Sequence, residues 1–276
     1  MTTEKLGPNV YPFRPRFELW SDGAAKRRWI YLPPGTQIDT SDPDQWRFPA
    51  GTKLWKEFVR DGVRIETRLL FKHGSRVGDW TPVAYLWSER EAWAQPEGED
   101  NALGTSHDVP SAAECRGCHG GTRNGVLGFS AIQLPMFGAG ENLGLDGLQQ
   151  QGLLTLSLPR DNELPGDVRT RTALGYLHAN CSHCHNSLRP QRDGARCFDP
   201  ENSLDFMLRL DDLERLSNTA TYRTAIGDAV LPGDPARSPV MIRVKSRDPW
   251  WGMPALGSEE IDVRGNTVLE QWIRDL

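Results

Sequence analysis

The sequence lacks any apolar run approaching the roughly 20 residues that cross a bilayer, so we expect no membrane span. It also lacks a long run of charge of one sign. Its net charge of −5 excludes a general basic surface for nucleic acid. Cysteine and histidine are scarce, with five and six residues among 276. Because both types are rare, the positions at which they occur together carry information about function.

Four of the five cysteines lie in two Cys-x-x-Cys-His sequences, Cys115–His119 and Cys181–His185. This pattern is the attachment signature of c-type haem. Each thiol adds to one haem vinyl group, and the adjacent histidine ligates the iron from the proximal face. We therefore predict two covalently bound haem c groups. The predicted attachment residues are Cys115, Cys118, Cys181 and Cys184, and the predicted proximal iron ligands are His119 and His185.

Two other chemistries use Cys-x-x-Cys pairs. Structural zinc sites take four thiolates from two such pairs, but the pairs are usually about 15–20 residues apart, and here they are much farther apart. A redox-active dithiol needs a strand-to-helix setting and has no use for the trailing histidine. Both remain alternatives to haem.

Haem attachment belongs to the bacterial periplasm or an equivalent compartment, so we predict a periplasmic protein. Export demands a signal, yet Met1–Lys5 lead directly into polar, Pro-rich sequence with no apolar signal core. We expect that the signal was removed or was missed at the start of the gene. Cys197 is left as an odd thiol, either buried and inert or available for an intermolecular bridge.

Residues 10–93 have the pattern of an all-β region. Apolar and charged residues alternate from Val63 to Phe71, and Asp61-Gly62 provides a hairpin turn after a strand at Lys53–Arg60. Further strands are expected at Arg28–Leu32 and Val83–Trp87. Seven of the ten tryptophans also fall between Trp20 and Trp93. In a small β domain such residues are usually core and rim, although they can also stack a sugar or face a partner.

Helices are expected mainly after residue 101. Ser111 and Glu114 form a capping box before the first haem motif, and Asp167 can cap a helix that leads into the second. A short helix is expected at Leu145–Gln151. The last helix, Gly265–Asp275, has one apolar face, which we expect to pack against the helix Asp167–Asn180.

These patterns predict an α+β fold. An all-β sandwich or barrel-like domain of residues 1–97 would be followed by a mainly α-helical dihaem cytochrome c domain of residues 98–276. Within the second domain, residues 105–165 would hold the first haem site, and residues 166–276 would hold a second site similar to class I cytochromes c.

Two methionines are candidates for the distal side of the irons. Met253 precedes Pro254 shortly before the last helix, and we expect it to ligate the second iron rather than to fill the core. Met136, 17 residues after His119, is a candidate for the first iron. That position could instead take a histidine or stay open or water-bound. The histidines in question are His73, His107 and His178.

Several segments together resemble a family of bacterial periplasmic dihaem c-type cytochromes that carry an N-terminal β domain. Besides the two haem motifs, the segments are Leu19–Ala24, Trp46–Thr52, Ile65–Leu70, Tyr176–Asn180, Leu231–Pro235 with Ser238, and Met253–Gly257. The resemblance covers nearly the whole chain. It implies two haems but leaves the physiological redox partners undefined. We expect periplasmic redox proteins as electron donor and acceptor.

The leading hypothesis is an electron-transfer cytochrome without catalytic residues. The alternative is a haem enzyme, an oxidoreductase of the peroxidase or oxidase kind, whose first haem keeps an open distal position. A third reading makes the Trp-rich β domain the active part, binding a sugar or another cytochrome through exposed aromatic rings. The distal ligand of the first iron distinguishes the first two hypotheses.

Overall fold

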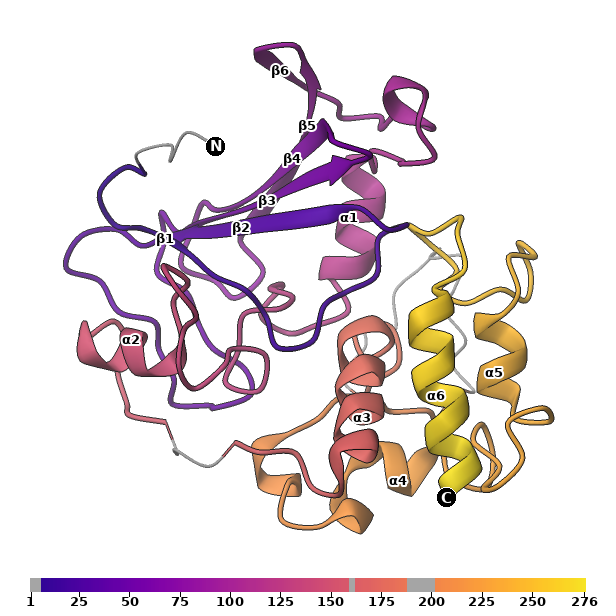
Figure 1. Ribbon diagram of the computed structural model, residues 1–276. Helices are drawn as coiled ribbons and strands as arrows, with labels where there is room; N and C mark the ends of the chain where they lie inside the picture. The colour runs from indigo at the N-terminus through magenta and orange to yellow at the C-terminus, as the bar shows by residue number, and fades with distance from the viewer. Residues whose placement is uncertain (1–5, 159–161, 188–201) are drawn as a thin grey trace. The chain divides into compact units, whose positions relative to one another are not determined.

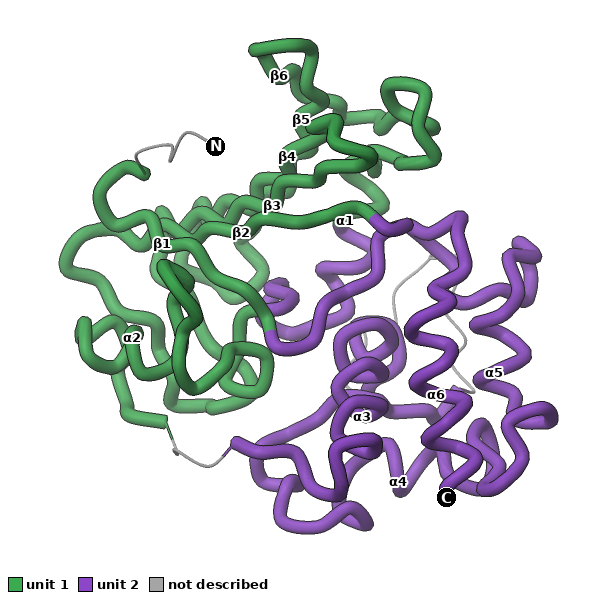
Figure 2. Tube along the Cα trace, viewed as in Figure 1, with its two compact units in different colours: residues 1–15, 24–115, 129–160 green, residues 16–23, 116–128, 161–276 purple. Residues whose placement is uncertain are grey.

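The computed structural model describes residues 6–158, 162–187 and 202–276 (Figure 1), so Cys197 lies outside the described residues. The chain forms two compact units that interleave along the sequence (Figure 2). Unit 1 comprises Met1–Pro15, Ala24–Cys115 and Phe129–Arg160, and unit 2 comprises Arg16–Gly23, Arg116–Gly128 and Asp161–Leu276.

Unit 1 is built on one antiparallel sheet whose six strands follow each other in chain order. The strands are β1 (Val10–Pro12), β2 (Ala25–Tyr31), β3 (Lys53–Arg60), β4 (Val63–Lys72), β5 (Trp80–Ser88) and β6 (Glu91–Ala94). The predicted hairpin is confirmed, because β3 pairs with β4 across Asp61 and Gly62, both of which have positive φ. The ladder shifts register between Phe58 and Val59, which places a bulge beside the turn.

One face of this sheet is covered by irregular chain from the same unit. Ile38 forms a parallel bridge with Leu154, and Phe129 packs edge-on against Phe13 and Trp46. These contacts bury a core that includes Ile30 and Trp46 without any exposed surface. The helix α2 (Leu145–Gln150) belongs to this covering segment.

The predicted fold class is wrong in both parts. A single six-stranded sheet replaces the sandwich or barrel, because strand alternation does not show whether the buried face meets a second sheet or irregular chain. The described part of the chain contains only six short helices, the longest of 13 residues, which does not fit a mainly α-helical cytochrome domain. With 20 prolines and 27 glycines, much of the chain forms turns and irregular segments.

The helices of unit 2 are positioned by local sequence signals. They are α3 (Val168–Asn180), α4 (Ala220–Thr224), α5 (Pro239–Val244) and α6 (Val263–Asp275), and α1 (Ala112–His119) crosses the boundary between the units. Asp167 caps α3 by accepting a hydrogen bond from the Thr170 amide at 2.8 Å. As predicted, α3 packs against α6, where Leu269, Trp272 and Ile273 are buried. None of the described helices combines the length and the apolar character that crossing a membrane requires.

Candidate functional site

The second Cys-x-x-Cys-His sequence continues directly from the end of α3. Cys181 is the C-cap residue, and its amide donates to the Leu177 carbonyl at 2.9 Å. The amides of Cys184 and His185 both donate to the Cys181 carbonyl, at 3.1 and 2.8 Å. The motif is therefore one further helical turn, which fixes both thiols and the histidine in one rigid frame.

A cavity of about 770 Å³, a volume that includes space open to solvent, lies in unit 2 beside this turn. Its walls bring together Cys181, Cys184, His185 and Met253, which are the four residues predicted for the second haem. The cavity thus joins a predicted attachment motif to the methionine predicted for its opposite side.

Two residues of the cavity wall have a buried polar atom that lacks a hydrogen-bond partner among the described residues. Nε of Arg247 and Oδ1 of Asn266 are buried and make no hydrogen bond among the described residues. A buried polar atom without a partner destabilises the fold unless a ligand or water satisfies it. The cavity wall itself is mostly apolar, as the site of a large flat cofactor would be.

The loop that carries Met253 is held by hydrogen bonds to Arg247. The Arg247 guanidinium donates from Nη1 to the Met253 carbonyl at 3.0 Å and from Nη2 to the Glu260 carbonyl at 2.7 Å. The Met253 amide in turn donates to the Arg243 carbonyl at 3.0 Å. Two of these hydrogen bonds hold the backbone of Met253 itself, and the third holds Glu260 on the same loop.

Residues far upstream in the sequence hold the segment after Met253. The carboxylate of Asp22, which is buried, accepts hydrogen bonds from the Ser258 hydroxyl and from the amides of Glu259 and Glu260, at 2.8, 3.2 and 2.9 Å. Trp20 donates from Nε1 to the Glu260 carbonyl at 3.1 Å and lines the cavity. These contacts give a structural role to the segment Leu19–Ala24.

The surroundings of His185 come from the segment that begins at Asn202. The His185 carbonyl accepts from the Phe206 amide at 3.0 Å, and the two rings meet edge-on with centroids 5.8 Å apart. Nδ1 of His185 lies 3.3 Å from Nδ2 of Asn202. Three contacts therefore hold His185: a backbone hydrogen bond from Phe206, the edge-on packing of the Phe206 ring, and the Asn202 side chain beside Nδ1.

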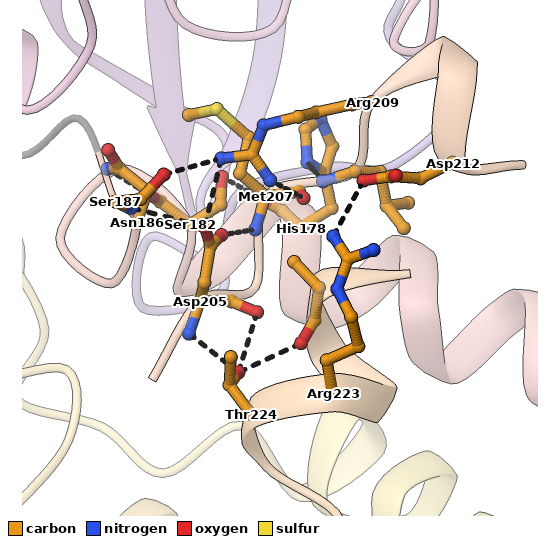
Figure 3. A network of polar contacts seen from close by, with 12 residues as sticks. His178, Ser182, Asn186, Ser187, Asp205, Met207, Arg209, Asp212, Arg223 and Thr224 are labelled. Atoms are coloured by element: carbon orange, nitrogen blue, oxygen red, sulfur yellow. Dashed lines mark hydrogen bonds and ion pairs between the residues drawn. The ribbon is translucent and has the colours of Figure 1, made fainter. Parts of the chain in front are cut away.

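A polar network anchors the same segment to α3, α4 and the second motif (Figure 3). Arg209 pairs with Asp205 at 2.9 Å, and the Ser187 amide donates to the same carboxylate oxygen at 3.1 Å. Thr224 accepts from the Asp205 amide at 2.9 Å. His178 accepts from the Leu208 amide at 3.1 Å through Nδ1. The network therefore links the segment 205–209 to α3, to α4 and to Ser187, just after the second motif.

The first Cys-x-x-Cys-His sequence lies in α1, which begins at the predicted capping box. Ser111 Oγ accepts from the Glu114 amide at 3.2 Å, and Glu114 accepts from the Ser111 amide at 2.8 Å. His119 Nδ1 lies 2.7 Å from the Gly125 carbonyl. A carbonyl can only accept, so Nδ1 carries the hydrogen of the neutral ring and Nε2 is the nitrogen that has the lone pair.

The two motifs approach each other in unit 2. The Gly121 backbone lies so close to the His183 carbonyl that any Cβ at position 121 would collide with it. The Asn186 side chain donates to the Gly121 and Ser182 carbonyls, at 2.9 and 2.7 Å. Cys118 lines the same cavity as Cys181. The segment that follows the first motif therefore approaches the second motif at Gly121.

The candidates for the first distal position lie in different surroundings. Met136 is half-buried in unit 1, where its carbonyl accepts from the Asp146 amide at 3.0 Å, and its ligation of iron stays a prediction. His107 is buried against Glu66 at 2.7 Å, and His73 is exposed and contacts Thr81 at 3.0 Å. His178 is engaged in the network described above.

Two observations bear on the alternative chemistries of Cys-x-x-Cys pairs. Across residues 6–158, 162–187 and 202–276, no group of three or more His, Cys, Asp or Glu side chains is arranged to hold a metal ion. Haem needs no such group, because the porphyrin supplies four of the ligands. Burial raises the pKa of the Cys181 thiol to about 12, whereas a redox-active dithiol works through a lowered pKa.

No family model, curated protein or solved structure matches the chain.

Sequence reasoning found the residues with local signatures and missed those that act across the chain. No sequence pattern predicts that Asp22 and Arg247 contact the Met253 loop. None predicts that Asn202 contacts His185. The segment Leu19–Ala24 was singled out by resemblance, but its role as an anchor for residues 258–260 needed the structure. Nothing in the sequence indicated that Cys118 of the first motif lines the same cavity as the second motif.

Proposed function

We propose that the chain is a periplasmic dihaem c-type cytochrome that transfers electrons between redox proteins. The observation that carries the proposal is the cavity whose walls bring together Cys181, Cys184, His185 and Met253. These residues match the covalent anchors and the two axial ligands of a low-spin haem c. The haem would supply an iron that cycles between two oxidation states. The chain's own residues hold the group, orient it and limit the access of water.

The first motif supports the same proposal through a different contact. The hydrogen bond from His119 to the Gly125 carbonyl sets the tautomer in which Nε2 can bind iron. Cys115 is buried and Cys118 is half-buried on the same helix. We infer that the first site also attaches haem c. Both haems would be attached in the periplasm.

The function is tested by the ligation state of the irons. If both haems transfer electrons only, both are six-coordinate and low-spin when oxidised, and the reduced protein binds carbon monoxide poorly. Visible and paramagnetic resonance spectra of the full chain, before and after carbon monoxide is added, measure this. A high-spin signal from one haem, with prompt carbon monoxide binding and peroxidase activity that is lost in His119→Ala, would instead establish the enzyme alternative.

A further inference from the structure

Two tryptophans that stand just before Met253 in the sequence have exposed side chains. Trp250 is 85% exposed and Trp251 is 63% exposed. A tryptophan side chain buries about 150–250 Å² when it is covered, so two neighbouring rings in water leave a large apolar surface uncovered. Large apolar side chains that are exposed together, rather than singly, mark sites of interaction.

The backbone that carries both rings is fixed by a turn at Asp248. Oδ1 of Asp248 accepts from the amides of Trp250 and Trp251, at 2.9 and 3.1 Å, and its carbonyl accepts from the Gly252 amide at 2.7 Å. Gly252 is buried, and a Cβ built there would lie 2.7 Å from the Ser246 carbonyl oxygen. A defined turn therefore presents the two rings, and a preorganised site loses less conformational entropy when a partner binds.

The side chain that contacts Trp251 comes from α5. Cζ of Arg243 lies 4.9 Å from the centroid of the Trp251 ring, which is a cation–π contact. The preceding residue of α5, Ile242, is 59% exposed. We call Ile242, Arg243, Trp250 and Trp251 the tryptophan patch. Tryptophan and arginine are enriched among the few side chains that carry most of the binding energy at protein–protein contacts.

The charge that the tryptophan patch presents to a partner is positive. Arg243 makes no ion pair within the described part of the chain. Between Arg243 and Met253 the sequence has one carboxylate, that of Asp248, and it accepts from the amides of its own turn. Lys245 is already paired with Glu270 at 2.8 Å. A partner that carries carboxylates around an apolar centre therefore complements the patch.

The tryptophan patch and the proposed haem site are built on the same stretch of unit 2. The Met253 amide donates to the Arg243 carbonyl at 3.0 Å, so the charged residue of the patch also holds the residue proposed to bind iron. Val244 and Arg247 line the cavity together with Met253. A protein seated on the patch would therefore lie at the side of the cavity that Met253 occupies.

The size of the patch distinguishes a brief contact from a stable one. Two fully covered tryptophan side chains contribute about 300–500 Å², whereas a stable interface needs about 800 Å² from each partner. Electron-transfer encounters are smaller and bury less than about 1,200 Å² in total. A two-fold dimer centred on so small a patch would also bring two copies of Arg243 near each other. The patch therefore fits a transient redox partner better than a second copy of the chain.

We propose that the tryptophan patch is the docking site of an acidic redox protein that exchanges one electron with the haem attached at Cys181 and Cys184. The exposed rings provide the apolar centre of the contact, and Arg243 attracts the carboxylates of the partner. This inference rests on the proposed function. It adds the place at which the partner binds and the charge that the partner carries.

The experiment measures how fast a protein and a small reagent reduce the oxidised, haem-loaded full chain. The protein is flavodoxin hydroquinone, an acidic donor whose flavin gives one electron to ferric iron and becomes the semiquinone. The small reagent is dithionite, which needs no docking site. Trp250→Ala/Trp251→Ala and Arg243→Gln are compared with the wild-type chain. Trp93→Ala is the matched control, because Trp93 is 65% exposed and lies on β6 in unit 1.

We expect Trp250→Ala/Trp251→Ala to lower the second-order rate constant of one haem with flavodoxin about tenfold, because the central side chains of the contact are lost. The rate with dithionite, the visible spectrum and the melting temperature should be unchanged, since both rings are exposed. Arg243→Gln should lower the flavodoxin rate less and weaken its dependence on salt. Trp93→Ala should change none of these.

Four other results would overturn the docking site. Equal flavodoxin rates in the double variant and in Trp93→Ala, with two haems present, reject it and leave the proposed function intact. Slower reduction by both reagents, or a changed spectrum, means that the two rings shape the haem site instead. A wild-type dimer that becomes a monomer in the double variant, as measured by sedimentation, means that a second copy covers the patch. If the chain takes up no haem, the proposed function fails and the docking site fails with it.

Discussion

The two histidines that we propose as proximal iron ligands are held by different means. The Gly125 carbonyl fixes the tautomer of His119, whereas His185 faces the amide of Asn202 and the ring of Phe206. A carbonyl acceptor makes the imidazole a stronger electron donor to a metal. If both irons are bound as proposed, the two haems differ in potential partly for this reason.

Met253→Leu tests whether the thioether at the cavity wall binds iron. We expect the variant to lose the iron–thioether charge-transfer band near the red edge of the visible spectrum and to lower the potential of one haem, because a thioether favours reduced iron. The matched control is Met241→Leu, which changes a buried core methionine in the same unit. An identical spectrum and potential in the two variants would make Met253 core packing.

We expect the folded protein to lose stability in acid because of His178. Burial, with the charges of Arg209 and His183, lowers its pKa to about 4, against the opposing charge of Asp205. The unfolded chain therefore binds more protons between about pH 6.5 and 4, so stability is full above this window and falls as the pH drops through it.

His178→Asn keeps an acceptor for the Leu208 amide but removes the titrating group. We expect its unfolding free energy, from denaturant titrations, to depend less on pH between 6.5 and 4 than that of the wild-type chain. His73→Asn, at an exposed position, serves as the control. Equal pH slopes in all three chains would contradict the assignment.

The roles of some residues could be predicted because those roles depend only on residues nearby in the sequence. The capping residues Ser111 and Asp167 and the Asp61-Gly62 turn are confirmed for this reason. Asp22 could not be assigned, since its three partners lie more than 230 positions away. Trp93 is 65% exposed while Trp46 is fully buried, a difference that composition does not show.

Gly121 is the glycine on which the approach of the two motifs depends. A side chain there would collide with the His183 carbonyl, which is backbone and cannot rotate away. Gly121→Ala should therefore destabilise the chain by about 2 kcal/mol or more. Gly78→Ala is the control, because no atom lies within 4 Å of a Cβ built there.

Thermal unfolding, followed by the absorbance of each haem, measures the effect of Gly121→Ala. We expect both haem environments to change together, since Gly121 touches the second motif and follows the first. A melting temperature equal to that of Gly78→Ala would refute the close contact.

The elements of the fold were easier to predict than their arrangement. Strand alternation and helix caps predict β3, β4, α3 and α6, but not how the sheet is covered. The buried face of the sheet meets irregular chain such as the Ile38–Leu154 bridge, which carries no periodic pattern. A sandwich was therefore the wrong inference from correct strands.

In unit 2, the prediction assigned too much helix. Its short helices are joined by irregular segments that polar networks hold in place, as around Asp205 and Arg209 (Figure 3). Such segments follow from tertiary contacts and not from periodicity. Assigning a helical domain to residues 98–276 over-extended the signals of a few capped helices.

The site of unit 2 is held by contacts from several segments of the chain. Its cavity holds the residues proposed for one haem. The network around Asp205 and the contacts of Asp22 fix the backbone around this cavity. A rigid site lowers the reorganisation that accompanies a change in charge, as an electron carrier requires.

The most direct test is the intact mass of the full chain, produced with haem c maturation and denatured before measurement. The account predicts a mass that exceeds that of the polypeptide by two haems, falling to one in Cys181→Ala/Cys184→Ala and in Cys115→Ala/Cys118→Ala. A chain that carries no covalent haem, or zinc in its place, would contradict it.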